Sequence, residues 1–161
     1  MERHFPSAAS PDRPVVAFGP ELPGFGSWEW VGQELAEELS RDFQTVRFSR
    51  EIPACDVLVI VKQSLPAAVV EQVARHAAVI YCPIDFYDSG PAIDRDGPML
   101  ARCTRIVVHC ERLRKYFQSY APVEYIDHHV RFAAALREEF VEKGPILWAG
   151  VRTSLFYTNQ D

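Results

Sequence analysis

Short apolar runs alternate with amphipathic stretches along most of the chain. An unbroken apolar run bounded by turn residues is typical of a strand that is buried on both faces of a parallel sheet. Such runs predict strands at residues 15–18, 45–48, 57–61, 79–82, 105–109 and 123–126. Most of the segments between them have room for the helices that connect parallel strands.

Helical spacing is clearest in the segment that follows the first apolar run. Ser27 can cap a helix there, because its hydroxyl can accept a hydrogen bond from a backbone amide of the first turn. The residues expected on the buried face of this helix are Trp28, Val31, Leu35 and Leu39. Further helices are predicted at residues 66–76, 99–103 and 111–120. The stretch 83–98, rich in glycine, proline and aspartate, is predicted to be irregular.

The alternation of strands and helices predicts an α/β fold with an open, mostly parallel, Rossmann-like sheet and helices on both faces. Residues 1–13 are expected to form a flexible leader, and residues 14–143 a single Rossmann-like domain. A further helix is predicted at 132–140 and a further strand at 145–150. We interpret residues 144–161 as the start of a missing second domain, or as an edge strand with a tail.

Composition and charge narrow the class of protein. The chain has 161 residues, 48% apolar and 24% charged, with a net charge of −5, which is typical of one compact globular domain. The charges are scattered without a basic run, so nucleic acid is not an expected partner. No apolar run approaches the ~20 residues of a membrane span, and the first residues lack a signal-peptide stretch. We therefore expect a cytoplasmic protein, with peripheral attachment to a membrane left open.

Neither the cysteines nor the histidines predict a metal site. The cysteine spacing matches neither a redox pair nor a zinc ribbon, so buried free thiols are predicted for Cys55, Cys82, Cys103 and Cys110. A zinc site built from Asp127, His128 and His129 with His109 and Cys110 is disfavoured. Adjacent histidines on an extended segment point to opposite sides, so they cannot easily share one metal ion.

Candidate functional residues follow the predicted strands, because ligands of open α/β sheets bind at the carboxyl ends of the strands. The residues expected to line a cleft for a polar acceptor are Lys62, Gln63, Tyr87, Asp88, His109 and Glu111. Asp85 lies among aromatic residues after the strand 79–82 and is the candidate base or hydrogen-bond acceptor. The alternative for Asp85 is an aspartate that caps a turn.

The sequence Gly24-Phe25-Gly26-Ser27 joins the first strand to the first helix. Backbone amides and the helix dipole at such a place can hold a phosphate, although a plain tight turn explains the glycines equally well. The next glycine is Gly32, so the G-x-G-x-x-G pattern of a nicotinamide dehydrogenase is incomplete. The lysine-containing ending of a P-loop is absent too.

Residues 14–150 resemble the amino-terminal domain of GT-B-fold glycosyltransferases. The resemblance rests on the glycine loop 24–30, the strand 56–61 and the strand–turn–helix segment 106–113. Residues 125–130 resemble the family's crossing segment, with Asp-His-His in place of Pro-Asn-Gly. Residues 144–150 look like the first strand of the family's donor-binding domain.

The resemblance implies transfer of a sugar from a nucleotide-sugar donor to an acceptor. Gly24, Gly26 and Ser27 would then face the donor diphosphate, and Asp85 lies near the position at which the family often carries a catalytic histidine. The nucleotide-sugar would serve as co-substrate, and no other cofactor is expected. Only eleven residues follow Gly150, so we expect an incomplete enzyme that needs a separate donor-domain chain or a second copy.

Two other functions stay open at this point. One is a non-catalytic Rossmann-like binding or partner module, in which residues 146–149 pair with the sheet of another chain. The other is a small α/β hydrolase or phosphatase that uses Asp85 or Asp88. The chain lacks a G-x-S-x-G elbow, which weighs against an esterase.

Overall fold

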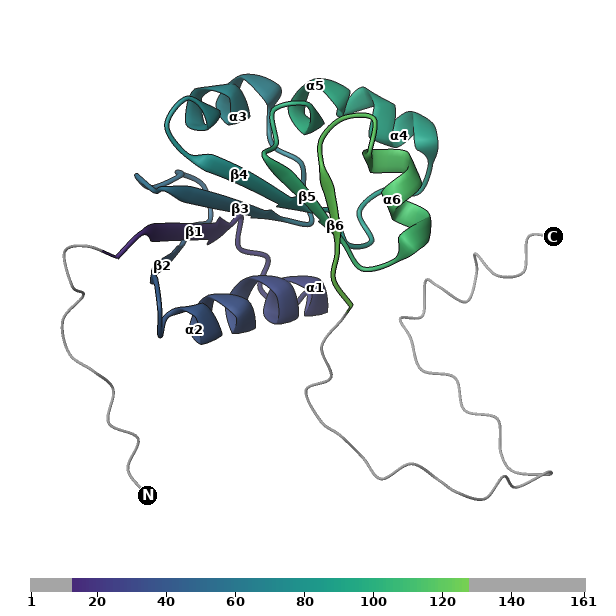
Figure 1. The fold of residues 1–161 in the computed structure, drawn as a ribbon. Coiled ribbons are helices and arrows are strands. Elements are labelled where there is room, and N and C mark those ends of the chain that lie inside the picture. Colours follow the sequence, from purple (N-terminus) through teal and green to yellow (C-terminus); the bar gives the residue numbers. More distant parts are fainter. Residues whose placement is uncertain (1–12, 128–161) are drawn as a thin grey trace, which may run out of the picture. The chain divides into compact units, whose positions relative to one another are not determined.

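The computed structural model describes residues 13–127 (Figure 1). These residues form an α/β fold around a six-stranded open sheet in which every neighbouring pair of strands is parallel. The strands are β1 (Val15–Gly19), β2 (Gln44–Arg47), β3 (Val57–Val61), β4 (Ala78–Cys82), β5 (Arg105–Val108) and β6 (Val123–Tyr125). The predicted Rossmann-like sheet is thereby confirmed. Residues 1–12 of the predicted leader, the predicted helix 132–140 and all of 144–161 lie outside the described range.

Helices cover both faces of the sheet, as predicted. Figure 1 shows α1 and α2 on one face, and α3, α4, α5 and α6 on the other. The helices are α1 (Gly26–Trp28), the π-helix η1 (Glu29–Glu34), α2 (Leu35–Leu39), α3 (Ala67–Ala74), α4 (Gly90–Arg95), α5 (Gly97–Leu100) and α6 (Glu111–Phe117). The segments α1, η1 and α2 follow one another without a break and form one continuous helical stretch.

An apolar layer lies on each face of the sheet because consecutive strand residues point to opposite sides. Leu58 and Ile60 of β3 belong to the larger cluster, which also holds buried residues of α3, α5 and α6. Val59 and Val61 belong to the smaller cluster, which holds Trp28 of α1. Each such side chain, when fully buried, contributes roughly 1.5–3 kcal/mol through removal of apolar surface from water.

The stretch 83–98 is irregular only in its first part, residues 83–89, and is largely helical after that, contrary to the prediction. It contains α4 and the first half of α5, so the short helix predicted at 99–103 was placed too late. Pro91 and Pro98 each stand in the first turn of one of these helices. A backbone amide in that turn has no partner within the helix, so proline costs nothing there. Both prolines belong to the composition on which the prediction of irregular structure rested.

The buried face of the first helical stretch also differs from the prediction. Leu35 is 38% exposed, whereas Gly32 and Ala36 are buried with Trp28. A π-helix forms its hydrogen bonds between residues i and i+5, so η1 turns the following residues away from their α-helical positions. A Cβ atom on Gly32 would lie 2.3 Å from Cε3 of Trp28, so the indole occupies the space of a side chain at position 32.

The cysteines in the described range are free thiols, as predicted. Cys82 and Cys103 are buried, while Cys55 and Cys110 are half-buried. Burial raises the pKa of both buried thiols to about 12, and for Cys82 the nearby Cys103 adds a smaller increase. Both thiols therefore stay protonated near neutral pH, and they pack as small apolar side chains.

Candidate functional site

The strand order places a topological switch point between β1 and β3. The order is β2-β1-β3-β4-β5-β6, so the chain leaves β1 toward β2 on one side and continues to β3 on the other side of β1. The helical connection after β1 lies on one face of the sheet, and α3, which follows β3, lies on the opposite face (Figure 1). Open α/β sheets bind ligands outside the carboxyl ends of the strands at such a point.

The glycine turn follows β1 at this switch point. Gly24 has a φ of +83°, which favours glycine, and the amide of Phe25 donates to the carbonyl of Leu22 at 3.1 Å. The helix begins at Gly26, so the amides of Gly26 and Ser27 belong to the first turn, which has no acceptors within the helix. A Cβ atom on Gly26 would meet no atom within 4 Å. Neither packing nor a positive φ therefore requires glycine at position 26.

Lys62 follows β3 at the same switch point, and its ammonium reaches the loop after β4. Its Nζ lies 2.5 Å from Oδ1 of Asp85. Lys62 has a φ of +65°, and Ile84, which precedes Asp85, has a φ of +54°. The left-handed region costs a non-glycine residue roughly 1–2 kcal/mol, and a β-branched residue such as isoleucine is rare there. Strained residues of this kind cluster at functional sites.

The Lys62 ammonium connects the glycine turn with Asp85. Only 18% of the Lys62 side chain is exposed, whereas 68% of the Asp85 side chain is exposed. The Nζ atom lies 5.9 Å from the centre of the Phe25 ring, which allows a cation–π contact. Phe25 itself is 54% exposed. The structure thus gathers residues from three segments, after β1, β3 and β4, around one partly desolvated cation.

The left-handed backbone at Lys62 gives a stability prediction. We expect Lys62→Gly to be more stable than Lys62→Ala by about 1 kcal/mol, because only glycine adopts this conformation without a steric cost. Urea denaturation of both variants measures the difference. Lys115 in α6 is the matched control, since there the glycine variant should be less stable than the alanine variant by about 1 kcal/mol. The same order at both positions would contradict the left-handed assignment.

The other predicted cleft residues come from several segments near the strand ends. Gln63 and Asp88 are exposed, and the Tyr87 ring packs at 5.7 Å against Phe117. His109 and Glu111 follow β5, and β4 separates β5 from β3. Two strand spacings correspond to roughly 10 Å, so the strand that leads to these two residues is not adjacent to the strand that leads to Lys62. Their assignment to an acceptor cleft stays a prediction.

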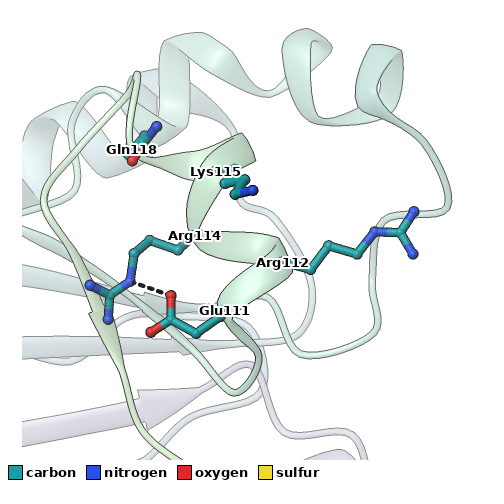
Figure 2. A pocket seen from close by; sticks show the side chains of 5 residues that line it. All are labelled: Glu111, Arg112, Arg114, Lys115 and Gln118. Atoms are coloured by element: carbon teal, nitrogen blue, oxygen red, sulfur yellow. Dashed lines mark ion pairs between the residues drawn. The ribbon is translucent and has the colours of Figure 1, made fainter.

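Two surface pockets among the described residues lie away from this group. The first is lined by one face of α6 and by the residue that follows it, namely Glu111, Arg112, Arg114, Lys115 and Gln118. Figure 2 shows that Glu111 and Arg114 point toward each other, whereas Arg112 points away. Nε of Arg114 lies 3.2 Å from Oε2 of Glu111, close enough for an ion pair but without the geometry of a hydrogen bond. The second pocket lies between α3 and residues 50–54.

Residues 13–127 contain neither a candidate metal cluster nor a helix suited to cross a membrane. No group of three histidine, cysteine, aspartate or glutamate residues in this range is arranged to hold a metal ion. The disfavoured zinc site includes His128 and His129, which lie outside the range. None of the helices of the described part combines the length and the apolar character that a bilayer crossing requires.

Three residues near the site were missed in the sequence. Phe25 was part of the predicted glycine loop without a role of its own, Tyr81 was part of the predicted strand 79–82, and Asp96 belonged to the stretch predicted to be irregular. The hydroxyl of Tyr81 donates to the carbonyl of Lys62 at 2.8 Å, and Tyr87 donates to Asp96, also at 2.8 Å. A signal existed for Tyr81, because a tyrosine in a strand buried on both faces needs a partner for its hydroxyl.

Comparisons with known proteins add no identity to this geometry. Neither a protein-family model, nor a curated protein, nor a solved structure matches the chain. The features that bear on function are therefore the glycine turn, Lys62 and Asp85 at the switch point.

Proposed function

We propose that this domain binds the diphosphate of a nucleotide-sugar at the β1/β3 switch point, as part of a glycosyltransferase-like protein. One observation carries the proposal. The Lys62 ammonium lies within cation–π distance of Phe25, which is part of the glycine turn. In the same turn, Gly26 has no structural reason to be glycine. The close approach of a ligand to the main chain supplies such a reason.

The chemistry of the site suits phosphate oxygens. The amides of the first helical turn point out along the helix axis and carry partial positive charge. Lysine adds a full positive charge and is a common phosphate ligand, acting as a point charge. Because the Lys62 side chain is largely buried, its attraction for an anion is screened less than that of an exposed lysine.

Asp85 supplies the second function that a sugar transfer needs. Its carboxylate accepts the proton of the acceptor hydroxyl while the hydroxyl oxygen attacks the anomeric carbon, and the nucleoside diphosphate leaves with the bonding electrons. Asp85 is mostly exposed, so it can reach an acceptor while a phosphate takes its place beside Lys62. Transfer requires donor and acceptor in one cleft, and a second domain, in the same protein or on a partner chain, closes that cleft.

Gly26→Ala tests the proposed ligand. We expect the free energy of unfolding to change by less than about 0.5 kcal/mol, because the added methyl group meets open space. The affinity for UDP-glucose should fall about tenfold, because the methyl group hinders approach of the diphosphate to the first-turn amides. An NMR titration measures the affinity, and urea denaturation measures the stability.

A companion variant shows that the two glycines serve different purposes. Gly24→Ala should lose about 1 kcal/mol of stability, since its φ of +83° is unfavourable for alanine. If Gly26→Ala binds UDP-glucose as tightly as the unmodified protein, the turn does not contact the ligand and the proposal fails.

A further inference from the structure

Tyr81 connects the interior of the sheet with the candidate site. It lies in β4, its side chain is fully buried in the larger apolar cluster, and its hydroxyl lies 2.8 Å from the carbonyl oxygen of Lys62. The hydroxyl of Tyr87 lies 3.3 Å from that of Tyr81, with the two rings edge to face. Tyr87 in turn donates to Oδ2 of Asp96 at 2.8 Å. Tyr81 and Tyr87 thus form a chain of hydrogen bonds from Asp96, at the carboxyl end of α4, to the backbone of Lys62.

The direction of the protons along this chain follows from its ends. Asp96 accepts the only hydroxyl proton of Tyr87, so the Tyr87 oxygen can act only as an acceptor toward Tyr81. The Tyr81 hydroxyl must therefore act as the donor in both of its contacts. Its main acceptor is the carbonyl of Lys62, which is nearer than the hydroxyl of Tyr87. Burial is the main cause that raises the pKa of both tyrosines, so both hydroxyls stay protonated near neutral pH.

Lys62 is consequently held by hydrogen bonds on both sides of its Cα atom. Its amide donates to the carbonyl of Cys82 at 2.8 Å, and its carbonyl accepts from Tyr81. These two bonds fix the peptide planes on either side of a residue whose left-handed conformation is otherwise disfavoured. The direction of the Lys62 side chain, toward Asp85 and Phe25, depends on those planes.

We infer that Tyr81 is a positioning residue, whose buried hydroxyl holds the Lys62 backbone so that the ammonium is preorganised for a diphosphate at the switch point. The identity of the ligand rests on the proposed function, whereas the positioning of the ammonium does not. Preorganisation of this kind matters because a charged group that must first be ordered binds more weakly. Tyr81 acts through Lys62 and needs no contact with the ligand.

The test compares three tyrosine variants by their dissociation constants for inorganic pyrophosphate. Tyr81→Phe keeps the ring and leaves the Lys62 carbonyl without its donor, so the dissociation constant should rise about tenfold. Tyr87→Phe keeps the bond from Tyr81 to Lys62 and should change affinity less than about threefold. Tyr120→Phe removes a tyrosine–carboxylate bond to Asp94, outside this chain, and should leave affinity unchanged.

A second readout needs no ligand. Contact with Asp85 should slow the exchange of the Lys62 ammonium protons with water, which NMR of the ¹⁵N-labelled protein detects. We expect this protection to be lost in Tyr81→Phe and kept in Tyr120→Phe. If the unmodified protein binds no pyrophosphate while the ammonium responds in this way, the proposed ligand is wrong and the positioning role stands.

Other outcomes overturn the inference. If Tyr81→Phe binds pyrophosphate like the unmodified protein, Tyr81 does not position Lys62 for the ligand. The same conclusion follows if Tyr81→Phe loses affinity while the Lys62 ammonium signal is unchanged. Tyr87→Phe as damaging as Tyr81→Phe contradicts the direct role of the Tyr81 hydroxyl. If Tyr81→Phe fails to fold, NMR of the unmodified protein tests the hydrogen bond directly. A Tyr81 hydroxyl that donates to the Lys62 carbonyl should give a slowly exchanging proton resonance with a nuclear Overhauser contact to residue 62. Its absence refutes the hydrogen bond.

Discussion

Replacing Trp28 with alanine is expected to lower the free energy of unfolding by about 3–5 kcal/mol. Trp28 is 2% exposed and packs with Val16, Phe18 and Val61 in the smaller apolar cluster, so its removal leaves a large cavity. Urea denaturation followed by circular dichroism measures the loss. The helical stretch that begins at the glycine turn is seated on the sheet by this indole.

A substitution at Gly32 tests the same contact with Trp28. In the unmodified protein Gly32→Ala should cost about 1–3 kcal/mol, because its Cβ atom would overlap the Trp28 ring. In the Trp28→Ala background the same change should be neutral or stabilising, since the methyl group then enters the cavity. An equal cost in both backgrounds would mean that Gly32 is required for its backbone and not for the indole.

The coupling of Trp28 and Gly32 has a consequence for the site. Gly26 lies only two residues before Trp28, so the position of the indole sets the position of the first helical turn. A variant that loosens Trp28 should therefore weaken ligand binding as well as stability. Gly26→Ala separates the two effects, because it alters the turn and leaves the indole packed.

The strands could be predicted because their signal is local. A strand buried on both faces is apolar throughout, and β3 was predicted with its observed limits, 57–61. Helix α4 was missed and α5 was placed too late, because Pro91 and Pro98 look like breakers unless the helix start is known. Knowledge of where the first turn lies depends on packing against the sheet, which no short window of sequence contains.

The π-helix shows a second limit of the sequence pattern. Trp28, Val31 and Leu35 fit an ordinary amphipathic helix, and nothing in that spacing indicates an inserted turn. Gly32 was the available signal, since a glycine in the middle of a helix costs about 1 kcal/mol and usually has a packing reason. It was read only as a glycine that fails to complete a dinucleotide-binding pattern.

The site was predictable as a set of residues but not as an arrangement. Gly24, Gly26, Lys62 and Asp85 could be named as candidates because each follows a predicted strand. That Lys62 meets the glycine turn depends on β3 pairing with β1 and not with β2, and the alternation of elements leaves this order open. The ion pair to Asp85 depends further on the left-handed backbone at Lys62 and Ile84, which neither residue type favours.

Substitutions of Lys62 and Asp85 should change diphosphate affinity in opposite directions. Lys62→Met removes the positive charge from a partly desolvated position, so the affinity for pyrophosphate should fall at least tenfold. Asp85→Asn keeps the shape of the side chain and removes the negative charge beside the ammonium. Because the carboxylate competes with the ligand for Lys62, the affinity should rise about fivefold at low salt.

Matched variants separate this local effect from the net charge of the protein. Lys115→Met removes an exposed positive charge on α6, and Asp88→Asn removes a negative charge three residues after Asp85. Both should change pyrophosphate affinity by less than about twofold, since interactions of solvent-exposed charges are weakened by water and by salt. Isothermal titration calorimetry at low and high salt measures all four variants.

The sign of the Asp85→Asn effect decides how the ion pair works. A rise in affinity means that Asp85 holds the ammonium until a phosphate replaces it, which frees the carboxylate for an acceptor hydroxyl. A fall in affinity means that the carboxylate orients Lys62 and stays paired when the ligand binds, and then Asp85 is not available as a base. The double variant Lys62→Met with Asp85→Asn should bind as weakly as Lys62→Met alone, because the aspartate acts on the ligand only through the lysine.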